Sequence, residues 1–271
     1  MLIRIGYNIS FEMEQDVPFL TLTRVHPSRQ ADLRSSDAIL TTPYAPVEVY
    51  LDTYGNLCSR FLAHPGTLSL YTEAIIKDSG DPDPVALGAL EVPVTELPPQ
   101  TLRFLLSSRY CEVDLLSSAA LELFGDVTPG WSRVQAVCDW VNSHVAFDYA
   151  RTRATKTALD VYTERVGVCR DFQHLAITFC RALNIPARYA AGYLGDIGVP
   201  AAPYPMDFSA WFEAWLDDRW WTFDARHNCP RIGRVLMATG RDAVDVAITT
   251  TFGPAKLTGF TVVSNEITDW T

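Results

Sequence analysis

The sequence predicts an α+β protein, in which an antiparallel β-sandwich-like region precedes a domain of mixed helices and strands. In roughly the first hundred residues, apolar residues occupy every second position between turn signals, as in short half-buried strands. Beyond that point, apolar residues recur three and four positions apart, which is the spacing of helices. We therefore predict a β-sandwich-like domain over residues 1–105 and an α+β domain over residues 106–271.

Four stretches of the first region have strand character. "IRIGYNISF" alternates strictly, and "PVEVYLDTYGNLCSRFLA" predicts two strands around a turn at Tyr54-Gly55-Asn56. "GTLSLYTEAII" and "ALEVPVTEL" continue the pattern. The Asp- and Pro-rich stretch "KDSGDPDPVALG" predicts an exposed loop between them.

Helix signals follow from about residue 110. "VDLLSSAALELFG" has helical composition and ends on a glycine, and Thr128-Pro129 is typical of the start of a helix. Thr157, with Asp160 three residues later, forms a capping-box pattern that predicts a further short helix.

The composition narrows the classes of function. A formal net charge of −10 argues against a protein that binds duplex nucleic acid, which needs clustered Lys and Arg. The chain has no apolar run long enough to span a bilayer. The start "MLIRIGYNIS" has no signal-peptide pattern, so we expect a cytoplasmic protein that binds no membrane.

Six scattered cysteines form no CxxC pair. In a cytoplasmic chain they are expected to be free thiols rather than a disulfide framework. His227 with Cys229, plus Cys169 and His174, matches no standard zinc-ligand spacing, so no metal is predicted.

The segment "GVCRDFQHLAITFCRALNIP" predicts a helix that begins at Cys169. Phe172, Leu175, Ala176, Phe179 and Leu183 form one apolar stripe, and Asn184 and Pro186 end the helix. A thiol at a helix N-terminus lies beside unpaired backbone N–H groups, which stabilise a thiolate and a developing oxyanion. Cys169 is therefore a predicted nucleophile, with a small buried capping residue as the alternative.

The segment "MDFSAWFEAWLDDRWWTFDARHN" predicts two strands joined by a turn at Asp217-Asp218. In that register Leu216 faces Arg219, and Asp224 is a diagonal neighbour of Ser209 on the same face of the hairpin. Asp224 is thus placed to orient an imidazole, but the residue at position 209 is a serine.

These two segments resemble those of the transglutaminase-like superfamily, whose catalytic core is a papain-like Cys-His-Asp triad. "RVGVCRDFQHLAITFCRALNIPARYAAGYL" is similar to its cysteine helix, and "DFSAWFEAWLDDRWWTFDARHN" is similar to its His/Asp hairpin. The β-rich first hundred residues resemble the region that precedes bacterial members. The resemblance implies that Cys169 is the nucleophile, that Asp224 is the orienting acid, and that Ser209 occupies the usual position of the histidine base.

A serine hydroxyl cannot act as a base or an acid near neutral pH, so another group must polarise the thiol if the protein is an enzyme. His227 is one substitute, provided that a loop redirects it, since a continued strand would point it to the other face. His174 is a second, although the resemblance implies a structural role for it. The third alternative is that nothing replaces the base. Trp211 and His174 are predicted to line the substrate groove.

The predicted function is cysteine-dependent acyl transfer on a peptide or amide, by hydrolysis or by transfer to an amine, weakened by Ser209. The alternative is a catalytically inactive module with the same fold that binds a peptide or protein. The sequence implies no cofactor, and it predicts neither the identity of the substrate nor the oligomeric state.

Overall fold

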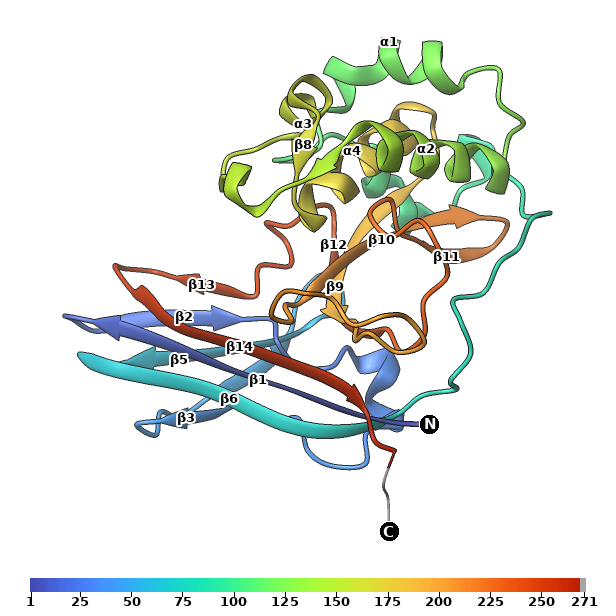
Figure 1. Cartoon of the computed structure of the whole chain (residues 1–271). Coiled ribbons are helices and arrows are strands. Elements are labelled where there is room, and N and C mark those ends of the chain that lie inside the picture. Colours follow the sequence, from blue (N-terminus) through green and yellow to red (C-terminus); the bar gives the residue numbers. More distant parts are fainter. Residues whose placement is uncertain (269–271) are drawn as a thin grey trace.

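The computed structural model describes residues 1–268 as three layers (Figure 1). Two antiparallel sheets form a β-sandwich, a third antiparallel sheet lies next to it, and helices cover the far side of that third sheet. The α+β class predicted from the sequence, with its β-rich beginning, is confirmed.

The sandwich contains two four-stranded sheets. The first has the order β14-β1-β6-β3, with β14 Lys256–Glu266, β1 Leu2–Met13, β6 Gly66–Lys77 and β3 Leu40–Thr42. The second has the order β13-β2-β5-β4, with β13 Thr249–Thr251, β2 Val17–Thr21, β5 Leu57–Ala63 and β4 Glu48–Leu51. Alternate residues of β1, such as Ile3, Ile5 and Ile9, are buried between the sheets, as the period of two requires.

The end of the chain returns to this sandwich. β14 pairs with β1 along almost its whole length, and β13 pairs with β2. The division into residues 1–105 and 106–271 did not anticipate that residues 249–266 share the sheets of the first region. Non-local pairing of this kind leaves little trace in a local sequence pattern, because each strand alternates in the same way whichever neighbour it has.

One predicted strand is wrong. The segment "ALEVPVTEL", residues 89–97, contains only the 3₁₀ turn η2 (Val94–Glu96), with Pro93 immediately before it. Proline has no N–H to donate to a ladder, and two more prolines follow, Pro98 and Pro99, the second of which begins η3 (Pro99–Leu105). This segment is therefore an irregular connection between the sandwich and the helices.

The second region has four α-helices and an antiparallel sheet of order β11-β10-β9-β12. The helices are α1 Val113–Phe124, α2 Trp131–His144, α3 Ala158–Glu164 and α4 Cys169–Ala182. The sheet strands are β9 Ala187–Tyr193, β10 Ser209–Leu216, β11 Arg219–Phe223 and β12 Val235–Gly240. The short elements are β7 Ala146–Phe147, β8 Val166–Gly167, η1 Pro27–Asp32 and η4 Tyr149–Arg151.

The hairpin of β10 and β11 has the predicted register. Leu216 pairs with Arg219, and Phe212 pairs with Phe223. Asp217 has a positive φ of 53°, as a tight two-residue turn requires. The capping box of Thr157 and Asp160 is also present at the start of α3. By contrast, α2 begins at Trp131, after Gly130 with φ 97°, and not at the predicted Pro129.

Helix α4 packs on β9 and β10, as its apolar stripe predicts. Phe172, Leu175, Ala176 and Phe179 are all buried in the core between the helices and the sheet. A second core fills the sandwich and includes Phe208, the residue just before β10. Strand β10, which begins at Ser209, is thus anchored in both layers.

Arg181, in the last turn of α4, fixes this helix to its surroundings. Its guanidinium is buried and donates hydrogen bonds to the carbonyl oxygens of Ala187, Leu106 and Arg241 and to the Ser108 hydroxyl. These acceptors lie in the segments on either side of the helix. Arg181 therefore sets the position of the helix that carries Cys169 at its other end.

We predict that Arg181→Met lowers the free energy of unfolding by about 3 kcal/mol or more, because a hydrogen bond from a charged donor contributes about 1.5–3 kcal/mol and several are lost together. Urea denaturation measures this change. The matched control is Arg4→Met, which removes an exposed ion pair with Glu73 and should cost at most about 0.5 kcal/mol. Equal effects of the two substitutions would contradict this role of Arg181.

Candidate functional site

Cys169 is the first residue of α4, and the turn before it is tightly packed. A Cβ atom on Gly167 would lie 2.6 Å from the Cβ of Asp171, so the close approach of the chain requires glycine. The Asp171 carboxylate accepts a hydrogen bond of 2.9 Å from the Val168 N–H and so caps the helix. The residues "GVCRD" thereby place the thiol at the N-terminus of the helix, as predicted.

Burial raises the pKa of the Cys169 thiol to about 11. The positive charge of Arg226 and the N–H of Arg170 lower this pKa, while Asp207 raises it further. Desolvation therefore outweighs the helix N-terminus, contrary to the thiolate expected from the sequence. The thiol is protonated at neutral pH and needs a base before it can attack a carbonyl carbon.

Asp224 follows the last residue of β11 and is buried, with 6% of its surface exposed. Its Oδ1 accepts hydrogen bonds from Gln173 Nε2 at 3.0 Å and from the backbone N–H groups of Arg226 at 3.0 Å and His227 at 3.1 Å. Its Oδ2 lies 2.9 Å from His227 Nδ1 and 3.0 Å from Arg234 Nη2. Both carboxylate oxygens are fully satisfied by these partners.

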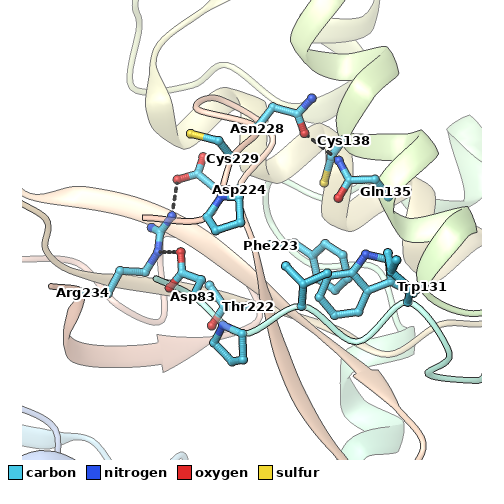
Figure 2. Close-up of a pocket in the computed structure, with 14 residues that line it drawn as sticks. Asp83, Trp131, Gln135, Cys138, Thr222, Phe223, Asp224, Asn228, Cys229 and Arg234 are labelled. Carbon is cyan, nitrogen blue, oxygen red and sulfur yellow. Dashed lines mark hydrogen bonds and ion pairs between the residues drawn. The ribbon is translucent and has the colours of Figure 1, made fainter. Parts of the chain in front are cut away.

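Arg234 connects Asp224 to a second carboxylate (Figure 2). Its Nε lies 2.8 Å from Asp83 Oδ2, while its Nη2 contacts Asp224. Burial alone would raise the pKa of Asp224, but the Arg234 guanidinium and the hydrogen bonds from His227 hold that pKa well below its usual range. The carboxylate is therefore ionised at every pH at which the protein is expected to function.

His227 approaches Asp224 because the chain turns sharply after β11. The Asn228 N–H donates to the Asp224 carbonyl oxygen at 2.8 Å, and Asn228 has a positive φ of 51°. A continued strand would have pointed His227 to the opposite face, but this turn brings its ring back to the Asp224 carboxylate. Donation from Nδ1–H to Asp224 leaves Nε2 available as a proton acceptor.

Cys169, Ser209 and His227 line one cavity of ≈ 220 Å³. Ser209 begins β10, where it pairs with Gly192. Within residues 1–268 its hydroxyl makes no hydrogen bond to Asp224, whose carboxylate is bonded by Gln173, His227 and Arg234 instead. The cavity brings the nucleophile together with the histidine of the turn, and Asp224 lies next to that histidine.

The two residues predicted to line the substrate groove lie elsewhere. His174 is completely buried: its Nε2 accepts the Ala243 N–H at 3.1 Å, and its ring stacks on Tyr110. Burial and nearby arginines lower its pKa well below the usual range, so it is a neutral core residue. Trp211 is 2% exposed and lies under the Arg234 guanidinium, 5.1 Å from its ring centroid. Neither residue lines the cavity that contains Cys169, and Trp211 instead lines a different cavity together with Asp83 and Arg234.

Three residues of the site had not been identified from the sequence. Gln173 lies one helical turn after Cys169, a spacing of four that could have placed it near the thiol. Its Nε2 bonds Asp224, and its Oε1 accepts the Ala225 N–H at 3.2 Å. Arg226 and Arg234 have no comparable signal, because their positions depend on the turn and on β12.

Among the described residues, no group of three or more His, Cys, Asp or Glu side chains is arranged to hold a metal ion. In the same part of the chain, no helix is both long enough and apolar enough to cross a membrane. All six cysteines are free, and Cys229 is the exposed one.

Comparison with known proteins points to one family. The model of the transglutaminase-like superfamily core matches residues 118–225, a range that contains Cys169, Ser209 and Asp224. A crystal structure of a proposed cysteine protease from Cytophaga hutchinsonii superposes with a TM-score of 0.84 at 32% identity. It covers 100% of this chain and 92% of that one.

Two further matches are more limited. An uncharacterized protein of Mycobacterium leprae is 31% identical over 117 residues, which is 42% of this chain and 42% of that protein. The periplasmic domain of TgpA from Pseudomonas aeruginosa aligns over 83% of this chain and 88% of that one, with 15% identity and a TM-score of 0.41. The assignment of the chain to a family does not rest on either of these two matches.

A cysteine begins a helix that packs on an antiparallel sheet. In the family that these matches identify, this fold supports papain-like cysteine chemistry. The similarity to the Cytophaga hutchinsonii structure extends over the sandwich as well as the core. The chain therefore belongs to the transglutaminase-like superfamily.

Proposed function

We propose that the protein catalyses cysteine-dependent acyl transfer on peptide or amide substrates, with Cys169 as nucleophile and His227 as base. The observation that carries the proposal is the contact of 2.9 Å between His227 Nδ1 and Asp224 Oδ2, in a histidine that lines the same cavity as Cys169. An imidazole held by a carboxylate on one nitrogen and open on the other is the arrangement that activates a thiol.

In the first half of the reaction, His227 Nε2 accepts the thiol proton while the sulfur of Cys169 attacks the amide carbonyl carbon. The backbone N–H of Cys169, at the helix N-terminus, is the proposed donor to the developing oxyanion. The C–N bond then breaks, and the imidazolium returns its proton to the leaving amine. Asp224 stabilises the charged ring between these two transfers.

In the second half of the reaction, the thioester is broken. Water or an amine attacks the acyl carbon, His227 accepts a proton from it, and the C–S bond breaks to release Cys169 as a thiol. Water gives hydrolysis, and an amine gives a new amide. Peptides or proteins are the expected substrates, and the cytoplasm stays the expected location.

A catalytically inactive peptide-binding module is the second candidate function. Two observations favour it: the serine at position 209 and the raised pKa of the Cys169 thiol. A turnover assay separates it from the proposed function, because both share the same fold and cavity.

The first test is of the base. We predict that His227→Ala lowers kcat/KM by about 10²–10⁴-fold, the usual contribution of a positioned general base, and that Ser209→His adds little to the wild-type rate. An activated ester and a peptide amide serve as substrates. His64→Ala is the control, because His64 is exposed and bonds only Asp16 in the sandwich.

Three results would count against His227. A wild-type rate that is unchanged by His227→Ala would exclude it as the base. A gain of about 10²-fold or more from Ser209→His would indicate that the wild-type site has no working base. If the wild-type protein shows no more turnover than Cys169→Ala does, the binding module is favoured.

The second test is of the thiol. Because only the thiolate reacts and its pKa is about 11, we expect the alkylation rate of Cys169 to rise about tenfold per pH unit from pH 7 to 9.5 without levelling off. Iodoacetamide labelling followed by peptide mass mapping measures this rate. Cys180 should label later still, since it is completely buried.

Glutathione is the control for this profile, because an ordinary thiol has a pKa of about 8.5 and its rate levels off above about pH 9. If Cys169 labels rapidly and independently of pH above pH 7, the thiol is already ionised. The resting thiol would then not be protonated, and proton transfer to His227 would precede substrate binding rather than accompany the attack.

A further inference from the structure

The turn that carries His227 is bonded on two sides. Its N–H groups donate to Asp224 and Gln173, which belong to the candidate site. Two of its carbonyl groups and the Asn228 side chain are bonded instead to α2. The contacts with α2 lie outside the proposed catalytic set.

A polar face of α2 makes these contacts. Gln135, Asp139 and Asn142 are spaced four and three residues apart, so they lie on one face of the helix. Neighbouring positions carry the apolar residues that bury α2 in the core between the helices and the sheet: Val134, Val137, Cys138 and Val141. The core therefore fixes the helix, and the helix presents the three polar side chains to the turn.

Asn142 binds the backbone of the turn. Its Nδ2 donates to the carbonyl oxygens of Arg226 at 2.7 Å and of Ala225 at 3.3 Å, which a side-chain amide can do because it carries two hydrogens. The N–H groups of the same two peptide units, those of Arg226 and His227, donate to Asp224. Both peptide units that lead to His227 are thus held at each end.

Asn228 binds the same face of α2 through its side chain. Its Oδ1 accepts from Gln135 Nε2 at 2.8 Å, as Figure 2 shows, and its Nδ2 donates to Asp139 Oδ1 at 2.8 Å. Gln135 Nε2 also donates to Asp139 Oδ1 at 2.9 Å, which closes a ring of hydrogen bonds. The positive φ of 51° at Asn228 is costly for a residue with a side chain, and these bonds offset that cost.

The three residues of α2 do not line the cavity of the nucleophile. His227 lines the cavity that contains Cys169, but none of these three residues does. Gln135 lies instead, with Asn228, at a separate cavity of ≈ 250 Å³. Any effect of α2 on catalysis is therefore transmitted through the turn and not by contact with the substrate or the sulfur.

On the basis of the proposed function, we infer that three residues of α2 are positioning residues for His227: Gln135, Asp139 and Asn142. Asp224 binds the ring at Nδ1, while α2 fixes the backbone from which the ring extends. Transfer of the thiol proton requires Nε2 to come within hydrogen-bonding reach of the sulfur. A displacement of about 1 Å can lower the rate of such a step by about 10²-fold. Both supports of the turn are therefore needed for the full rate.

The first experiment removes the donors of Asn142. Asn142→Leu preserves the approximate shape of the side chain without adding a charge. We expect kcat on an activated ester and on a peptide amide to fall by about tenfold to hundredfold, with little change in KM, because Asn142 does not touch the substrate. Ser132→Leu is the control, since Ser132 is exposed in the first turn of the same helix. It should leave both constants unchanged.

A double-mutant cycle tests the ring of side chains. Asn228→Gly keeps a positive φ accessible and removes the side chain, and Asp139→Ala removes the acceptor. Each should lower kcat by about tenfold, and the double variant should fall no further than Asn228→Gly alone, because both break the same contact. Asp139→Asn should retain most of the wild-type rate, since its amide oxygen can accept the same two hydrogen bonds.

Amide hydrogen exchange measures the turn independently of activity. The peptide that contains residues 225–228 should exchange about fivefold faster in Asn142→Leu than in wild type, the factor that corresponds to the loss of one typical hydrogen bond. A control peptide from β1 in the sandwich should exchange at the same rate in both proteins, which would show that the whole protein has not been destabilised.

An unchanged kcat in Asn142→Leu would overturn the inference, and a fall in His227→Ala would show that the proposed function still holds. A rise in KM alone would also overturn it, since Asn142 would then contact the substrate. If wild type turns over neither substrate, the proposed function fails, and hydrogen exchange decides the inference. Faster exchange confined to residues 225–228 supports the positioning of the turn by α2. Equal exchange overturns it, as does an equal acceleration in the β1 peptide.

Discussion

The buried carboxylate of Asp224 is the constraint on which the site depends. An ionised carboxylate is costly to bury unless its oxygens are fully hydrogen-bonded and its charge is compensated. Gln173 from α4, the turn that carries His227, and Arg234 before β12 meet these requirements together. Because three separate segments converge on one group, displacing any of them would leave a buried charge unsatisfied. The three segments therefore keep this arrangement, because any other would leave the buried carboxylate without its partners.

The sandwich contributes to the site through the same network. Arg234 binds Asp83, which lies in the loop that leaves the sandwich after β6, and that carboxylate also accepts the Arg231 N–H. Phe208 extends into the sandwich core and fixes the start of β10 beside the cavity. The pairing of β14 with β1 holds the end of the chain in the same layer. The first region thus supports the sheet β11-β10-β9-β12 and is not an independent attachment.

The sequence was sufficient for features that depend on local periodicity. Alternation located β1, the turn at Asp217 located the hairpin and its register, and the apolar stripe located the helix that begins at Cys169. The sequence pattern was insufficient to predict the structure where one side chain determines the path of the backbone. The return of His227 depends on hydrogen bonds from the turn to the Asp224 carboxylate, which no hydropathy pattern records. The pKa of the thiol was missed for a related reason, since desolvation depends on segments distant in sequence.

A histidine base on a strand and one on a turn are held by different forces. At position 209 a ring would be held by the ladder between β10 and β9, and the acid would only need to orient it. At position 227 the ring belongs to a turn whose N–H groups bond the Asp224 carboxylate, so the same carboxylate shapes the backbone and orients the ring. Arg234 keeps that carboxylate charged while it does both. If His227 serves as the base, as proposed, its position is inseparable from the network around Asp224, because the same hydrogen bonds fix the turn and the ring.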